Sequence, residues 1–163
     1  MFDMGTDNLP TQTIPPRLHP PETDIGAISL YVHIPFCETK CPYCDFNTYT
    51  AIESLIPSYI SALKTELSLW SSRLGRPRVT TVFFGGGTPS YLPAADIESL
   101  LKHIRTCCDL DIVQEITLEC NPGDVTLDKL SSYLDSGVNR LSIGVQSFSD
   151  SLLRLLGRRH TSS

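Results

Sequence analysis

The sequence lacks three features that would mark a membrane, secreted or nucleic-acid-binding protein. No stretch approaches the ~18 consecutive apolar residues that a membrane-spanning helix needs. The first residues, Met1 to Asn8, have neither a basic start nor an apolar run, so no secretory signal is expected. Asp and Glu (18) outnumber Lys and Arg (13), and a net charge of −5 argues against nucleic-acid binding. We therefore expect a soluble, cytoplasmic protein with no membrane span and no nucleic-acid partner.

The length of 163 residues, 40% of them apolar, is consistent with one globular domain. Residues 1–27 hold five of the twelve prolines and show no packing period. This composition predicts a disordered leader. The domain itself is expected to span residues 28–163.

Four strand patterns alternate with helix patterns along this domain. The strands are expected at 28–34, 79–84, 115–119 and 138–145. Pro57 is expected to open the first helix, Thr126 to cap the third, and the fourth to run from about 149 to 156. Such alternation predicts the α/β class, with a parallel sheet covered by helices. A closed eight-unit barrel takes about 250 residues, so ~136 residues supply about four units. The chain is then either a small open sheet or the first part of a larger barrel.

Three cysteines form a C-x3-C-x2-C run directly after the first strand: Cys37, Cys41 and Cys44. Without an export signal, such a run indicates metal or redox chemistry before disulfides. A [4Fe–4S] cluster held by protein alone takes four thiolates. Three thiolates would therefore leave one iron open to an exchangeable ligand. The alternative is a set of buried or zinc-binding cysteines, although tetrahedral zinc sites usually have four ligands.

Other candidate site residues also follow strands. Gly85, Gly86 and Gly87 allow close backbone approach, and their N–H and C=O groups could pair with a small polar ligand. Such a turn is also a common structural device. Glu119 ends the third strand and Gln146 follows the fourth, so parallel strands would bring both to one mouth. Their groups suit hydroxyl and ammonium recognition. On spacing alone, however, ordinary solvation is the simpler interpretation.

Together these segments resemble the radical S-adenosylmethionine (SAM) superfamily, and within it the family of oxygen-independent coproporphyrinogen III oxidases and HemW-like proteins. The resemblance rests on the cysteine run with Tyr43 before its third cysteine, and on segments 31–37, 85–90, 116–122, 137–148 and 155–160. It implies the N-terminal four β/α units of a partial (β/α)6, TIM-like barrel that binds a [4Fe–4S] cluster and SAM. Members of the family are much longer, so we expect this chain to be an N-terminal fragment, truncated on its C-terminal side.

The resemblance also implies residue roles. It makes Cys37, Cys41 and Cys44 the cluster ligands, and it assigns no catalytic residue. Eight positions match residues that contact SAM or support its site: Tyr31, Tyr43, Gly86, Gly87, Thr88, Glu119, Gln146 and Arg158. Relatives often carry alanine where this chain has Cys120, so we expect a small buried residue there. Cys107 and Cys108 are expected to end a helix and to be inert.

One position separates the two branches of the family. The decarboxylating oxidases resemble C-x3-C-x2-C-x-C, whereas this chain has Phe46 in place of the last cysteine. The form C-P-Y-C-D-F-N resembles the HemW branch, which implies a heme chaperone that delivers heme to acceptor proteins. The implied partners are heme or a porphyrin, a heme acceptor protein, and a one-electron donor such as reduced flavodoxin or ferredoxin. The alternative is an oxygen-independent oxidase that decarboxylates coproporphyrinogen III.

Overall fold

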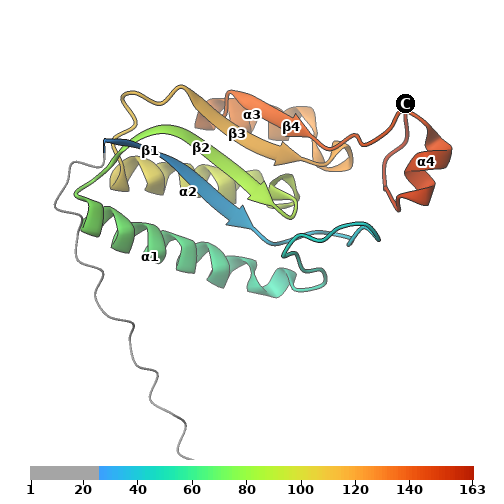
Figure 1. The fold of residues 1–163 in the computed structure, drawn as a ribbon, viewed down its shortest axis with the longest axis horizontal. Helices are drawn as coiled ribbons and strands as arrows, with labels where there is room; N and C mark the ends of the chain where they lie inside the picture. Colours follow the sequence, from blue (N-terminus) through green and yellow to red (C-terminus); the bar gives the residue numbers. More distant parts are fainter. Residues whose placement is uncertain (1–25) are drawn as a thin grey trace, which may run out of the picture.

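The computed structural model describes residues 26–163, in which a four-stranded parallel sheet has the order β1-β2-β3-β4 (Figure 1). The strands are β1 (Ala27–Ile34), β2 (Arg78–Gly86), β3 (Glu115–Cys120) and β4 (Arg140–Ile143). The helices are α1 (Ile56–Leu74), α2 (Ala94–Cys107), α3 (Leu127–Ser136) and α4 (Asp150–Leu155), with short 3-10 turns η1 (Glu53–Leu55), η2 (Pro89–Tyr91) and η3 (Pro122–Asp124). The predicted α/β class and the four β/α units are confirmed. The predicted leader lies outside the described residues except for its last two, and Ala27 already belongs to β1.

Local signals set the helix ends as the sequence predicted. Pro57 lies in the first turn of α1, where its missing N–H leaves no hydrogen bond unmade. Thr126 caps α3, because its hydroxyl accepts the backbone N–H of Lys129 at 3.3 Å. Gly75 and Gly137 follow α1 and α3 in the left-handed conformation (φ 70° and 100°) that ends a helix. No helix of residues 26–163 has the length and apolar character needed to cross a bilayer.

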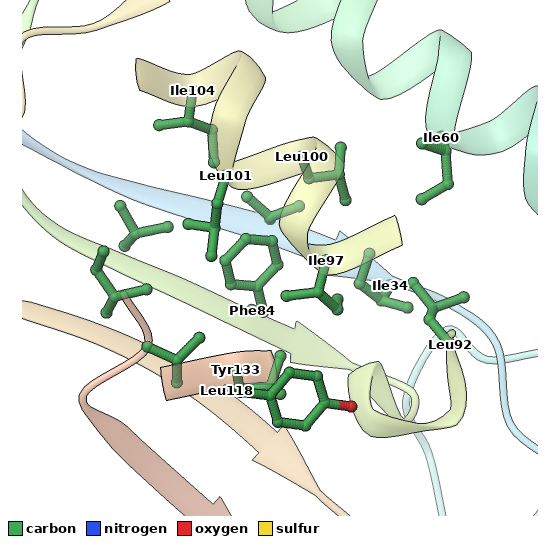
Figure 2. Close-up of a cluster of buried hydrophobic side chains, with 14 of the residues drawn as sticks. Ile34, Ile60, Phe84, Leu92, Ile97, Leu100, Leu101, Ile104, Leu118 and Tyr133 are labelled. Carbon is green, nitrogen blue, oxygen red and sulfur yellow. The ribbon is translucent and has the colours of Figure 1, made fainter. Parts of the chain in front are cut away.

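The core lies between the sheet and helices α1, α2 and α3. Alternate strand residues, among them Ile34, Phe84 and Leu118, point into it and meet Ile97 and Leu101 of α2 (Figure 2). The three helices lie on one face of the sheet, and α4 stands apart, beyond the carboxyl ends of the strands (Figure 1). The expectation that helices cover the sheet therefore holds for one face of the described chain. The intervening strand residues, such as Tyr31 and Glu119, belong to the open face.

Strand β4 is shorter than the predicted 138–145. Before it, the Asn139 side chain takes a place in the ladder, because its Oδ1 accepts the N–H of Ile116 at 2.8 Å. After it, the N–H of Val145 donates to the carbonyl of Ile143 at 2.9 Å. A second such three-residue turn follows around Gln146, whose φ is 66°. Backbone pairing with β3 extends one residue beyond β4 at each end, because the N–H of Asn139 donates to the carbonyl of Ile116 at 3.1 Å and that of Gly144 to the carbonyl of Cys120 at 2.9 Å. The turns at Val145 and Gln146 then end the pairing.

Strand β2 is longer than predicted. Gly85 and Gly86 are strand residues paired with His33 and Ile34, so the first two glycines continue the sheet and do not form a turn. The N–H of Gly87 extends the contact by donating to the carbonyl of Ile34 at 2.7 Å. The glycine segment therefore lies against the strand that leads into the cysteine run.

Candidate functional site

A cavity of about 260 Å³ opens at the carboxyl ends of the four strands. This is the edge where parallel α/β folds place their chemistry. Ten of the eleven predicted site residues line it: Cys37, Cys41, Tyr43, Cys44, Gly86, Gly87, Thr88, Glu119, Gln146 and Arg158. Residues far apart in the sequence meet here because most of them follow, or end, a strand of the same parallel sheet, while Arg158 comes from the segment after α4.

The cysteine loop, residues 37–49, forms one wall of the cavity. Two backbone hydrogen bonds close it: Cys37 N–H donates to the carbonyl of Tyr49 at 3.0 Å, and Tyr49 N–H to the carbonyl of Pro35 at 2.8 Å. The thiols of Cys37, Cys41 and Cys44 are all free. Within residues 26–163, no three cysteine, histidine or acidic side chains converge to hold a single metal ion. The loop thus presents three separate thiols to the same cavity.

Cys37 is the most enclosed of the three thiols. Burial raises the pKa of Cys37, and a contact of 3.4 Å between its Sγ and the hydroxyl of Thr88 partly offsets this rise. The hydroxyl of Thr48 also lies near this thiol and lowers its pKa, and Thr48 Oγ1 is buried without a hydrogen-bond partner. A buried hydroxyl of this kind needs an explanation, and a group bound in the cavity is one.

The glycine segment lies beside the start of this loop and leaves no room for side chains. A Cβ on Gly85 would stand 2.8 Å from Glu119 Oε2, and one on Gly87 would stand 2.7 Å from the carbonyl oxygen of Phe36. The N–H of Gly86 donates to Glu119 Oε2 at 3.1 Å, and the N–H groups of Gly87 and Thr88 donate to backbone carbonyls. The N–H groups of Gly86 and Gly87 therefore already have protein partners, and the pairing of the glycine N–H and C=O groups with a small polar ligand stays a prediction.

Arg158 reaches the cavity from the segment after α4. Its Nη2 donates to the carbonyl of Gly144 at 2.6 Å, and its Nη1 lies 3.6 Å from Sγ of Cys41. Its Nε is buried without a partner. Beside it, burial raises the pKa of Tyr43, and the neighbouring Cys41 raises it further, while the positive charge of Arg158 works against the rise. The guanidinium therefore lies against both the cysteine loop and the end of β4.

Tyr31 is the predicted site residue that does not line the cavity. It belongs to the open face of the sheet, where its ring stacks on Phe83 with 6.1 Å between centroids. Nε2 of His33 lies 3.0 Å from the carbonyl of Asn47, which can only accept, so Nε2 donates. Nδ1 is then the acceptor for the Tyr31 hydroxyl at 2.9 Å. Tyr31 thus contacts the cysteine loop through His33. Burial raises the pKa of Tyr31, and the charge of Glu119 adds to the rise.

Sequence reasoning missed eight other residues that line the cavity: Thr39, Lys40, Phe46, Thr48, Cys120, Asn121, Ser142 and Gly144. A usable signal existed for Ser142, because parallel register pairs it with Glu119 and so places it on the same face. Lys40 and Thr48 lie in an irregular loop, where no period indicates direction. Phe46 was singled out only as a marker of the family branch.

The remaining cysteines lie as predicted. Cys120 is buried in the core, and burial raises the pKa of its thiol to about 11, so it stays protonated. Cys107 ends α2 and Cys108 follows it, both buried. Cys107 and Cys108 do not line the cavity, and that they are inert stays a prediction.

Comparison with known proteins identifies relatives along almost the whole described chain. The family model of the radical SAM superfamily matches residues 31–163. The heme chaperone HemW of Escherichia coli is 45% identical over 135 residues, which are 82% of this chain and 35% of that protein. The mitochondrial radical S-adenosyl methionine domain-containing protein 1 of Mus musculus is 40% identical over 143 residues, 88% of this chain and 32% of that protein.

A solved structure also matches this fold. The coproporphyrinogen III oxidase HemN of Escherichia coli, described as a radical SAM enzyme, superposes with a TM-score of 0.78 at 34% identity. The match covers 85% of this chain and 32% of the oxidase. The four β/α units therefore correspond to part of a radical SAM barrel. The chain spans about a third of the length of the relatives that it matches.

Proposed function

The chain belongs to the radical SAM superfamily, and from that premise we propose that it binds a [4Fe–4S] cluster and SAM and acts as a heme chaperone. Membership of the superfamily implies the cluster and SAM. The heme cargo and its delivery rest on similarity to the HemW proteins, which share 39–45% identity with this chain. Because the chain spans about a third of their length, the activity of the whole protein is part of the proposal.

The donor set fits a cluster with one open iron. Cys37, Cys41 and Cys44 are free thiols on one loop facing one cavity, and thiolates are the ligands that iron–sulfur clusters take. The buried hydroxyl of Thr48 beside Cys37 has no protein partner, which fits a further acceptor in the cavity. When bound, the cluster supplies one electron that cleaves the sulfonium C–S bond of SAM.

The polar side chains of the cavity fit the amino-acid part of SAM. Glu119 and Arg158 place one negative and one positive side chain in the cavity, matching an ammonium and a carboxylate group. The second oxygen of the Glu119 carboxylate adds an acceptor to the one that already holds Gly86. Gln146 adds an amide that both donates and accepts. These residues would bind and orient the ligand.

The proposal of a chaperone rather than an oxidase rests on Phe46. Its side chain lines the cavity, at the position where the oxidase pattern has a further cysteine. An apolar ring there removes a thiol from the immediate surroundings of the three candidate ligands. The relatives with the higher identities are named as heme chaperones, and their identity exceeds the 34% shared with the oxidase structure.

The cluster is tested by anaerobic reconstitution with iron and sulfide. The chain is expected to take up about four irons and to lose them on Cys37→Ala, Cys41→Ala or Cys44→Ala. Cys107→Ala is the matched control, since Cys107 and Cys37 are each 9% exposed but only Cys37 faces the cavity. Binding of stoichiometric zinc by the chain, without iron uptake, would overturn the proposal of a cluster.

The chaperone is tested in a chimera that joins this chain to the remaining part of Escherichia coli HemW. The chimera is expected to bind heme, seen in the Soret band, and to pass it to an apo-acceptor without converting coproporphyrinogen III. Phe46→Cys reports whether a fourth thiol alone changes this outcome. Efficient decarboxylation of coproporphyrinogen III by the unmodified chimera would favour the oxidase.

A further inference from the structure

Arg159, next to the predicted SAM residue Arg158, joins three parts of the chain. One guanidinium nitrogen, Nη1, donates to Oε2 of Glu38, the residue that follows Cys37. The other, Nη2, donates to Oδ1 of Asp124 in η3 at 2.6 Å. A single side chain after α4 thus links the cysteine loop to the loop that follows β3.

The Asp124 end of this link is anchored in the protein interior. Its Oδ2 accepts the hydroxyl of Ser90 at 3.4 Å, and that hydroxyl accepts the N–H of Asn121 at 3.0 Å. The Asp124 side chain is only 6% exposed, and Ser90 is fully buried. Removing one partner of such an enclosed ion pair leaves an uncompensated charge, which costs more than the loss of a surface pair.

The neighbours of Arg159 support the same attachment. Arg158 lies between Sγ of Cys41 and the carbonyl of Gly144, and Nε2 of His160 donates to the carbonyl of Val145 at 3.0 Å. Burial lowers the pKa of Arg159, but the carboxylates of Asp124 and Glu38 outweigh it and the pKa is raised. The guanidinium is therefore a permanent positive charge between two carboxylates from different loops.

We propose that Arg159 is a positioning residue that, by bridging Glu38 and Asp124, holds the cysteine loop in the shape that receives the cluster. The cluster itself rests on the proposed function above. The planar fork of arginine can donate to two carboxylates at once, whereas lysine is a point charge that can serve only one well. Because Glu38 is bonded to Cys37, its movement moves the first thiol.

The test uses the apo chain under anaerobic reducing conditions, so that it does not depend on cluster loading. A pulse of iodoacetamide followed by peptide mass spectrometry gives the alkylation rate of each cysteine. Cys37 and Cys107 are each 9% exposed, so each must wait for an opening of the structure before it reacts. In Arg159→Gln, alkylation of Cys37 is expected to be about tenfold faster, while that of Cys107 stays unchanged.

Further variants make the outcome specific. Glu38→Gln alters the more exposed partner of the bridge and is expected to accelerate the alkylation of Cys37 as well. The double variant with Arg159→Gln is expected to show less acceleration than the product of the two single effects. Arg159→Lys is expected to restore part of the protection. Arg78→Gln is the matched control, because Arg78 pairs with Asp109 at 3.9 Å at the opposite end of the sheet.

The proposal is overturned if Arg159→Gln accelerates the alkylation of Cys37 and Cys107 alike, because that would mean general destabilisation. It is also overturned if the alkylation of neither cysteine becomes faster. Iron uptake by the same variants provides the second readout, with faster loss of iron to a chelator expected for Arg159→Gln than for Arg78→Gln. If Arg159 protects Cys37 from alkylation but no variant, nor the unmodified chain, takes up iron, the proposed cluster is wrong and the proposed bridge stands. The failure of one proposal can therefore be told from the failure of the other.

Discussion

Glu119 Oε2 accepts the backbone N–H of Gly86 at 3.1 Å, across the register between β3 and β2. The carboxylate occupies the space that a side chain on Gly85 would need, 2.8 Å from the position of its Cβ. The glycine segment and the acidic residue are therefore two halves of one feature. The glycines let the carboxylate lie flat against β2, and the carboxylate stays at the cavity wall as an acceptor.

Glu119→Gln is expected to keep the hydrogen bond to Gly86, because an amide oxygen also accepts, but to lose the negative charge. A hydrogen bond to a charged group contributes about 1.5–3 kcal/mol, so SAM binding is expected to weaken roughly 10- to 100-fold. Calorimetric titration of the reconstituted protein measures this. Glu115→Gln, at the other end of β3, is the control, and equal losses in both variants would contradict the assignment.

Gly87→Ala is expected to destabilise the fold by about 1–3 kcal/mol. Its Cβ would lie 2.7 Å from the carbonyl oxygen of Phe36 and 2.9 Å from that of Ile34, and backbone atoms cannot rotate away. Urea unfolding followed by circular dichroism gives the change. Gly123→Ala, where the new Cβ would lie 3.9 Å from Asn121 Oδ1, is expected to change stability by no more than about 0.5 kcal/mol.

Asn139→Ala is expected to lower the free energy of unfolding by about 1–3 kcal/mol, because it leaves the N–H of Ile116 without its acceptor. The same side chain donates from Nδ2 to the carbonyl of Gln114 at 3.0 Å. Asn139→Asp keeps the acceptor and loses only this donor, so a smaller loss is expected. Equal losses in the two variants would mean that the Ile116 contact does not matter.

The described chain leaves large apolar side chains exposed in α3, in α4 and just before α4, and β4 is an unpaired edge strand of the sheet. Leu127 is 85% exposed, Phe148 83% and Leu155 77%. Exposed apolar surface beside an unpaired edge strand favours self-association. Residues 1–163 alone are therefore expected to elute as oligomers in size-exclusion chromatography and to bind SAM weakly. The chimera with Escherichia coli HemW is expected to be monomeric, and a monodisperse 163-residue monomer with equal SAM affinity would count against this expectation.

The sequence alone determined the class of the fold, the order of its elements and the three thiols. Strand and helix periods, the cap at Thr126 and the glycine stops act over a few residues, so they can be read locally. The spacing of Cys37, Cys41 and Cys44 is likewise local. Position after a strand was enough to bring Glu119 and Gln146 to one cavity, because parallel strands share an edge.

Only the tertiary structure decided how these groups are held. The contact of Glu119 with Gly86 and the bridge from Arg159 to Glu38 and Asp124 join residues more than 30 positions apart. The structure also placed Tyr31 outside the cavity, where it contacts its neighbour His33. The start of β4 also depended on such a partner, since the side chain of Asn139 accepts the N–H of Ile116 across the sheet. Long-range contacts leave no period in the sequence, because they depend on which loops meet at the carboxyl ends of the strands.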